Sequence, residues 1–228
     1  MAGFVINAAS IAGATTTLSC AMPTGTTQGD IMIASVCSDW SSYANTTAPG
    51  GWTLRTGYDN GNNNIHCKVF TKTAGAGEAG PYAFGQGSSS DGVAAVVTLR
   101  GVFESTAAGN YNVTYTATTG TTRTAPTLTG AAGGAVLVCG AMCDGGASGA
   151  VTWTPPSGMA EQVDAASGAF TSQGIATLLS PGSPTGTKDF TVSGTTQSTG
   201  GIQWSAVFQP IPGAAAQSPV SRRRAANW

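Results

Sequence analysis

The feature that most constrains the fold of this chain is an internal repeat: segments of its first half recur in the same order in its second half. Four segments match: 33–39 with 138–144, 49–52 with 156–159, Gly80 and Phe84 with Gly186 and Phe190, and 92–99 with 201–208. Self-similarity in a constant order is typical of duplicated structural units. We therefore predict a fold built from two related halves.

In the last pair of segments, 92–99 and 201–208, the positions of the alternating apolar residues also match. In both segments the apolar residues that would face one way occupy matching places: Val93, Ala95, Val97 and Leu99 in the first half, and Ile202, Trp204, Ala206 and Phe208 in the second. A slip of one residue would turn a strand's side chains to the opposite face of its sheet. The agreement therefore predicts equivalent strands that bury the same face.

Short strand-like runs and frequent turn residues indicate an all-β protein. The 33 glycines and 11 prolines are spread along the chain rather than gathered in one segment, which suits many short turns. No helical stripe continues over three turns. Nine strands are predicted, at 15–21, 30–37, 65–73, 92–100, 111–118, 135–143, 174–179, 190–193 and 202–208. We predict a jelly-roll-like β-sandwich.

No linker separates the two halves, because residues 104–110 are followed at once by a predicted strand. We therefore expect a single body over 1–211, with halves at about 1–102 and 103–211. A chain of 228 residues is long enough to bury a sizeable core. The repeat pattern stops after residue 211, and residues 212–228 are predicted to form an extended basic C-terminal arm.

Charge and apolar patterning argue against nucleic-acid and membrane partners. Charged residues make up only 8% of the chain, and the body is mildly acidic once Arg222, Arg223 and Arg224 of the arm are set aside. Phosphate contact needs clustered Lys and Arg. No apolar run approaches the roughly 20 residues that span a bilayer. The first basic residue is Arg55, so we expect no secretory signal and synthesis in a reducing cytoplasm.

Residues that could carry chemistry are few and dispersed. The five cysteines lack the spacing of a zinc site and are expected to be free, buried thiols. His66 is the single histidine, and we expect it to be an exposed or partly packed residue of a strand. Asp39 and Asp144 occupy equivalent repeat positions, where starting a loop is a commoner role than catalysis. We expect no enzyme, no metal and no cofactor.

Aromatic residues provide two alternatives. Trp40 and Tyr43 lie in a Ser- and Asn-rich loop, where they could either form a sugar-binding platform or pin the end of the sandwich, and Tyr58 would join the platform. Trp52 and Trp153 are expected to cap the cores of their halves.

Several segments together resemble a family of β-rich virion proteins from tailed bacteriophages. They are Gly29–Ala34, Pro49–Leu54, Lys68–Phe70 ahead of Ala74–Ala76, and Val97–Val102. The resemblance covers residues 15–211, and its motifs are structural, so no functional residue can be carried over. The second half departs from the pattern, since Met159 stands where the first half has Trp52.

The resemblance implies a capsid decoration or minor capsid protein on the outer surface of the virion, made in the host cytoplasm. Its partners would be the major capsid protein and neighbouring copies of itself, with a homotrimer suggested by analogy with other decoration proteins. The arm would be the contact element, with Arg222, Arg223 and Arg224 pairing with an acidic capsid surface and Trp228 as an apolar anchor. A purely solubilising arm is the alternative.

A second function, from a different class, is a receptor- or carbohydrate-binding module of a phage tail or tip. It would bind a glycan through Trp40, Tyr43 and Tyr58. A tail adhesin is often joined to a fibre or coiled-coil segment, and the sequence contains none, so decoration is the favoured prediction.

Overall fold

The computed structural model describes residues 2–39, 43–61, 65–105, 109–117, 120–144, 151–168, 170–193 and 200–212. Apart from one short 3-10 helix, η1 (Tyr43–Asn45), the regular elements of these ranges are all strands, which confirms the predicted all-β sandwich. The strands of the first half are β1 (Phe4–Cys20), β2 (Ile31–Asp39), β3 (Thr53–Asp59), β4 (Ile65–Thr73), β5 (Tyr82–Arg100) and β6 (Val102–Phe103). Those of the second half are β7 (Tyr111–Thr116), β8 (Thr122–Ala125), β9 (Val136–Cys143), β10 (Trp153–Thr154), β11 (Ala160–Ser167), β12 (Thr171–Leu179), β13 (Lys188–Val192) and β14 (Gly201–Pro210).

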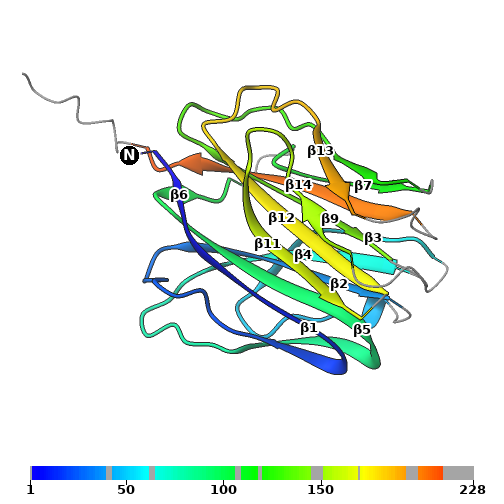
Figure 1. Ribbon diagram of the computed structural model, residues 1–228. Helices are drawn as coiled ribbons and strands as arrows, with labels where there is room; N and C mark the ends of the chain where they lie inside the picture. Colours follow the sequence, from blue (N-terminus) through cyan, green and yellow to red (C-terminus); the bar gives the residue numbers. More distant parts are fainter. Residues whose placement is uncertain are drawn as a thin grey trace, which may run out of the picture.

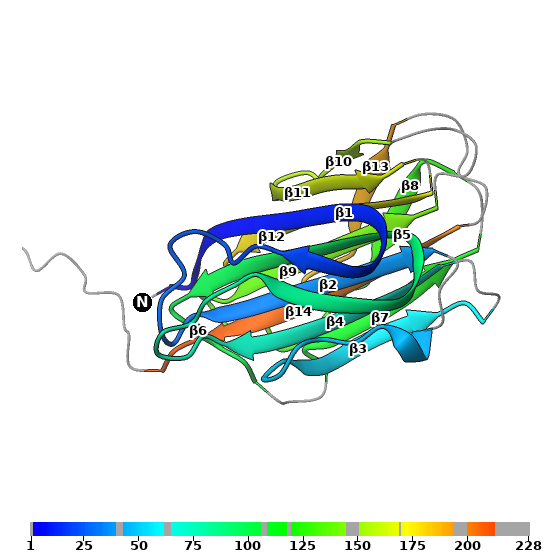
Figure 2. The same ribbon diagram turned by 90° about the horizontal axis from the view of Figure 1, so that it is seen from below.

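Two large antiparallel sheets lie face to face, and each half of the chain supplies one of them (Figures 1 and 2). The first sheet has the order β1-β5-β2-β4-β3, and the second has the order β11-β12-β9-β14 with β7 paired to the other side of β14. Read in the same direction, the second order is β7-β14-β9-β12-β11. The predicted repeat is therefore a repeat of strand order, and β6 is added beside the end of β14.

The register of the two sheets is equivalent, as the alternation of the sequence predicts. Ser35 of β2 is opposite Ala95 of β5, and the matching Gly140 of β9 is opposite Trp204 of β14. The edge strands β3 and β11 each carry a register irregularity at the same place, between Leu54 and Thr56 and between Glu161 and Val163. The halves thus share the details of pairing as well as the order of strands.

The turns that precede the edge strands are also alike. The amide of Trp52 donates to the carbonyl of Pro49 at 3.4 Å, and the amide of Met159 donates to that of Pro156 at 3.0 Å. Gly51 has φ of 87° and Gly158 has φ of 78°. This left-handed conformation is one that glycine adopts without steric cost, which explains why both halves keep a glycine there.

Three apolar clusters fill the part of the molecule that the structure describes. The central cluster lies between the two large sheets and takes residues from both halves, among them Ile33, Val97, Val138, Trp204 and Phe208. A second cluster covers the outer face of the first sheet, and a third covers the outer face of the second. A strand such as β2 is buried on both faces, so apolar residues fill consecutive positions at Ile31–Ala34 and again at Val36 and Cys37 instead of alternating with exposed polar ones.

A small outer layer closes each outer cluster. In the second half this layer is the three-stranded sheet β10-β13-β8. In the first half the ends of two long strands form it, with Thr17–Cys20 of β1 paired to Tyr82–Gly85 of β5 and Thr47 bridging Gly85. The jelly-roll-like wrapping therefore occurs inside each half, and the two halves then stack.

The sandwich has two different ends. We call the end where β14 finishes at Pro210 the arm end; Gly3, Gly101 and Leu179 lie there too, and the amide of Ile211 donates to the carbonyl of Gly101 at 3.1 Å. In Figure 1 the label N marks this end. We call the opposite end, where β2 finishes at Asp39 and β9 at Cys143, the loop end.

Candidate binding surfaces

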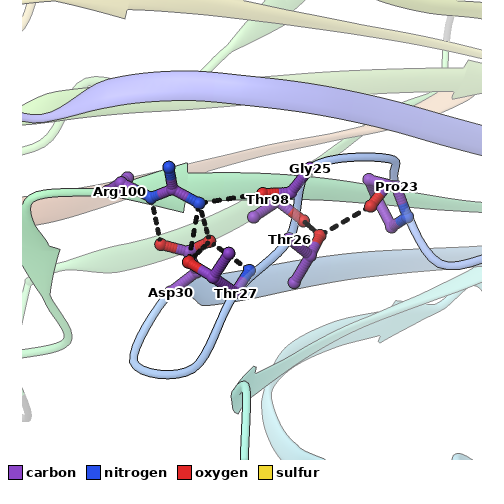
Figure 3. A network of polar contacts seen from close by, with 7 residues as sticks. All are labelled: Pro23, Gly25, Thr26, Thr27, Asp30, Thr98 and Arg100. Atoms are coloured by element: carbon purple, nitrogen blue, oxygen red, sulfur yellow. Dashed lines mark hydrogen bonds and ion pairs between the residues drawn. The ribbon is translucent and has the colours of Figure 1, made fainter. Parts of the chain in front are cut away.

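The loop that precedes β2 is fixed at the arm end by an ion pair (Figure 3). Arg100, the last residue of β5, donates from Nε to Oδ1 of Asp30 at 2.8 Å and from Nη2 to Oδ2 at 2.7 Å. Burial alone would raise the pKa of Asp30, but hydrogen bonds from Arg100 and from the Thr27 amide hold that pKa below its ordinary value. The pair joins two motifs that stand far apart in the sequence.

The same guanidinium also organises the rest of the loop. Its Nη2 donates to the carbonyl of Gly25 and to Oγ1 of Thr27, both at 2.8 Å. Thr26 Oγ1 donates to the carbonyl of Pro23 at 2.7 Å and lies 2.8 Å from Oγ1 of Thr98. The 21–30 loop is therefore a fixed part of the arm-end surface.

Exposed apolar side chains gather at the arm end. Their exposed fractions are 36% for Phe4, 38% for Phe103, 52% for Leu179 and 45% for Ile211. Phe4 and Leu179 line a hollow of about 380 Å³ together with Val5, Gln162 and Leu178. We call these four exposed residues of one end, Phe4, Phe103, Leu179 and Ile211, the apolar arm-end patch; exposed apolar side chains on one part of a surface are typical of interaction sites.

The predicted contact residues Arg222, Arg223, Arg224 and Trp228 lie outside the described residues, as does the predicted platform residue Trp40. What the structure does show is where the arm starts, because residue 212 follows Ile211 at the arm end.

Tyr43 lies at the loop end, in a closed polar cluster. The Lys68 ammonium is 4.3 Å from the centre of the Tyr43 ring, and His66 meets that ring edge-on at 6.0 Å. Lys68 also donates to the carbonyl of Thr46 at 2.8 Å, and burial lowers its pKa, an effect that Asp59 partly offsets. The Tyr43 ring therefore already has contacts within the protein.

His66 differs from the prediction. It is fully buried rather than exposed or partly packed, and its Nε2 lies 2.6 Å from Oγ1 of Thr46. The reason is that η1 and the residues after it fold over this face of β4, which strand alternation alone does not reveal.

The remaining predicted platform residue, Tyr58, stacks on Tyr115 of the other half. Their ring centres are 5.4 Å apart and their planes differ by 11°. An aromatic residue that the sequence analysis missed, Phe170, is more exposed, and it lines a hollow of about 460 Å³ with Asp39 and Ser88–Asp91. Phe170 has no apolar alternation around it, so no sequence signal marks it.

Trp52 and Trp153 lie where the sequence placed them. Trp52 packs on the first outer cluster and meets Tyr82 and Phe84 edge-on, with centres 5.2 and 5.5 Å apart. Trp153 is buried in the second outer cluster against Phe190.

The cysteines are also as predicted, since all five are free and buried. Burial raises the pKa of Cys20 and of Cys139 to about 12, and that of Cys143 to about 11. These thiols are therefore protonated at neutral pH.

The described ranges contain no group of three or more His, Cys, Asp or Glu side chains placed to hold a metal ion. They also contain no helix long and apolar enough to cross a membrane.

Comparison with known proteins gives no match to any family model, any curated protein or any solved structure. The resemblance to phage virion proteins therefore stays a prediction from the sequence.

Proposed function

We propose that the protein is a structural protein of a bacteriophage virion, a capsid decoration or minor capsid protein that binds the outer shell and stabilises it. The observation that carries the proposal is the apolar arm-end patch, at the end of the sandwich from which the basic arm continues. An apolar surface next to a basic segment can contribute to a protein interface in two ways, through burial of apolar area and through charge complementarity.

The rest of the body suits this role. Three apolar clusters and paired strands give a stiff block whose large sheets are covered on both faces. Its ends and edges are therefore the surfaces left for partners. In the proposal, Arg222–Arg224 pair with acidic groups of the major capsid protein, and Trp228 fills an apolar pocket of that protein. Neighbouring copies of this chain meet as a homotrimer around the binding site on the capsid.

Binding to purified capsids of the phage that encodes the chain tests the proposal. We expect the full chain to cosediment with capsids, and a chain ending at residue 212 to bind at least about tenfold more weakly. Leu179→Ser should weaken binding by a smaller factor. Phe170→Ser is the matched control, because Phe170 is comparably exposed but lies at the loop end. Undiminished binding by both the truncated chain and Leu179→Ser would end the proposal.

A glycan-binding tail or tip module is the second candidate, and the hollow beside Phe170 is the observation in its favour. An exposed ring next to carboxylate and hydroxyl groups is the usual chemistry of sugar recognition. Under this alternative, wild-type protein binds host-wall glycans and Phe170→Ala does not. Absence of glycan binding by the wild type would remove it.

A further inference from the structure

Two of the buried cysteines lie directly opposite each other on neighbouring strands. Cys37 of β2 pairs with Cys67 of β4, and their Sγ atoms are 3.2 Å apart. Opposed residues in an antiparallel ladder have Cα atoms roughly 4.5 or 5.5 Å apart. Both spacings fall within the roughly 4.4–6.8 Å range that a disulfide spans. A bond between these sulfurs therefore needs side-chain rotation and no rearrangement of the backbone.

The surroundings hold the two sulfurs together. Ser35 Oγ lies 3.6 Å from Sγ of Cys37 and 3.4 Å from Sγ of Cys67. From the opposite sheet, the Gln173 side-chain amide donates to Sγ of Cys37 at 3.1 Å and to Oγ of Ser35. The pair therefore belongs to the central apolar cluster and contacts two polar side chains there, those of Ser35 and Gln173.

The second half has no such pair. At the equivalent positions Met142 is opposite Gln173. Two other cysteines, Cys139 and Cys143, lie against the hydroxyl groups of Ser205 and Ser172, at 3.4 and 3.3 Å. The close approach of two thiols is thus a particular feature of the first sheet.

We propose that Cys37 and Cys67 close a cross-strand disulfide, which pins β2 to β4, when the chain meets an oxidising thiol–disulfide medium. One molecule of oxidised glutathione is the two-electron oxidant of the balanced step. A thiolate of the pair attacks it and releases one reduced glutathione, and the partner thiolate then displaces the second. The Cys37–Cys67 bond forms, and the two thiol protons end on the two glutathione thiols.

Burial controls when this step takes place. Both side chains have no exposed surface, and burial raises the pKa of Cys37, so a thiolate is disfavoured in the closed protein. Exchange therefore proceeds while the chain folds or when the sheets open. Once formed, the bond is shielded from reductants by the same packing. This inference concerns the first sheet alone and is independent of capsid binding.

The test is to refold the full chain in glutathione redox buffer and to measure intact mass and free thiols under denaturing conditions. We expect wild type to lose two of its five free thiols, to become about 2 Da lighter, and to gain about 5–10 °C in Tm over the reduced protein. Cys67→Ala and Cys37→Ala should each keep their four remaining thiols. Cys139→Ala, the buried control, should still lose two.

Five free thiols in oxidised wild type would overturn the proposal without recourse to any variant. Loss of two thiols in both Cys67→Ala and Cys37→Ala would also overturn it, because the bond would then involve other cysteines. The count is made on unfolded chains, so a variant that folds poorly still gives an answer.

Discussion

At the arm end, each half holds an equivalent loop by hydrogen bonds, but the two halves use different side chains to form them. In the first half, Arg100 donates to the carbonyl of Gly25 at 2.8 Å while pairing with Asp30. In the second half, Gln209 stands in the place of Arg100 and donates to the carbonyl of Gly130 at 3.0 Å. Gly25 and Gly130 have φ of 84° and 85°, so the two loops have the same bend.

The two halves also have equivalent oxygen atoms that accept a hydrogen bond from an amide of the loop. Asp30 Oδ2 accepts from the amide of Thr27 at 2.8 Å, and Gln209 Oε1 accepts from the matching amide of Ala132 at 3.0 Å. One neutral amide therefore does what an ion pair does in the other half. The fold therefore needs a hydrogen-bond donor and an acceptor at this corner, whereas a charge there is optional.

Towards the loop end, a buried apolar side chain of the first half is replaced in the second half by a buried cation that lacks some of its hydrogen bonds. Leu18 of β1 pairs with Phe84, and the matching Arg123 of β8 pairs with Phe190. Both side chains are fully buried, yet Nε and Nη2 of Arg123 have no hydrogen-bond partner. Its Nη1 donates to the carbonyl of Thr122 at 3.0 Å. Burying an unpaired cation is costly, so the second half carries a penalty here that the first half does not.

The largest effect is expected where the central core is asymmetric. Trp204 of the second half stands in the place of Ala95, and its indole lies against Gly140. Trp204→Ala should lower the free energy of unfolding by about 3–5 kcal/mol, because it leaves a cavity between the sheets. Urea denaturation measures the loss. Leu54→Ala, at an exposed residue, should cost little, and an equally small loss for Trp204→Ala would contradict the description of the core.

A second variant tests whether the Trp204 indole is the reason for the glycine at residue 140. Gly140→Ser should be destabilising alone, because a Cβ at residue 140 would come within 2.4 Å of the Trp204 indole. Added to Trp204→Ala, the serine should be tolerated, since the pair then copies Ser35 and Ala95. Equal costs of Gly140→Ser in the two backgrounds would show that the indole is not the cause.

A smaller effect, of opposite sign, is expected at Arg123. Arg123→Leu copies Leu18 and should raise the free energy of unfolding by about 1–4 kcal/mol, because it replaces a buried unpaired charge with an apolar side chain. The reciprocal Leu18→Arg should destabilise. Thermal and urea unfolding of both variants check the prediction, and destabilisation by Arg123→Leu would mean that the guanidinium contributes more than its hydrogen bonds indicate.

The smallest effect is a pH dependence of the arm-end corner, which the ion pair of the first half should show and the neutral Gln209 of the second half should not. The folded pKa of Asp30 is below its ordinary value of 3.8, so its carboxylate stabilises the fold above that pH. The stabilisation is lost as the pH falls through the folded pKa. Asp30→Asn should therefore lower Tm by a few degrees at pH 6, and the difference from wild type should vanish in acid. Glu161→Gln, on the exposed edge strand β11, is the control.

The class of fold and the equivalence of the halves could both be predicted from the sequence, because alternation and turn glycines are local signals. It missed β3, β6, β8, β10 and β11, and the first parts of β1 and β5. β11 is an edge strand whose residues alternate poorly, and the first part of β1 mixes apolar, small and polar side chains that are half-buried or exposed. Edge strands are stabilised by neighbours rather than by their own pattern.

The candidate surfaces were less accessible to sequence reasoning. Asp30 and Arg100 both stood in recognised motifs, but their contact depends on β5 lying beside β2. The burial of His66 depends on Thr46, and the stacking of Tyr58 depends on Tyr115 of the other half. Each is a contact between segments distant along the chain, which a local pattern does not encode.

The two equivalent halves share the central apolar cluster, so we expect them to unfold as one cooperative body. Differential scanning calorimetry of the full chain checks this expectation, because it compares the calorimetric enthalpy of unfolding with the van't Hoff enthalpy. We expect a single transition with a ratio close to one. Two resolved transitions, each with the enthalpy of half the chain, would contradict the claim.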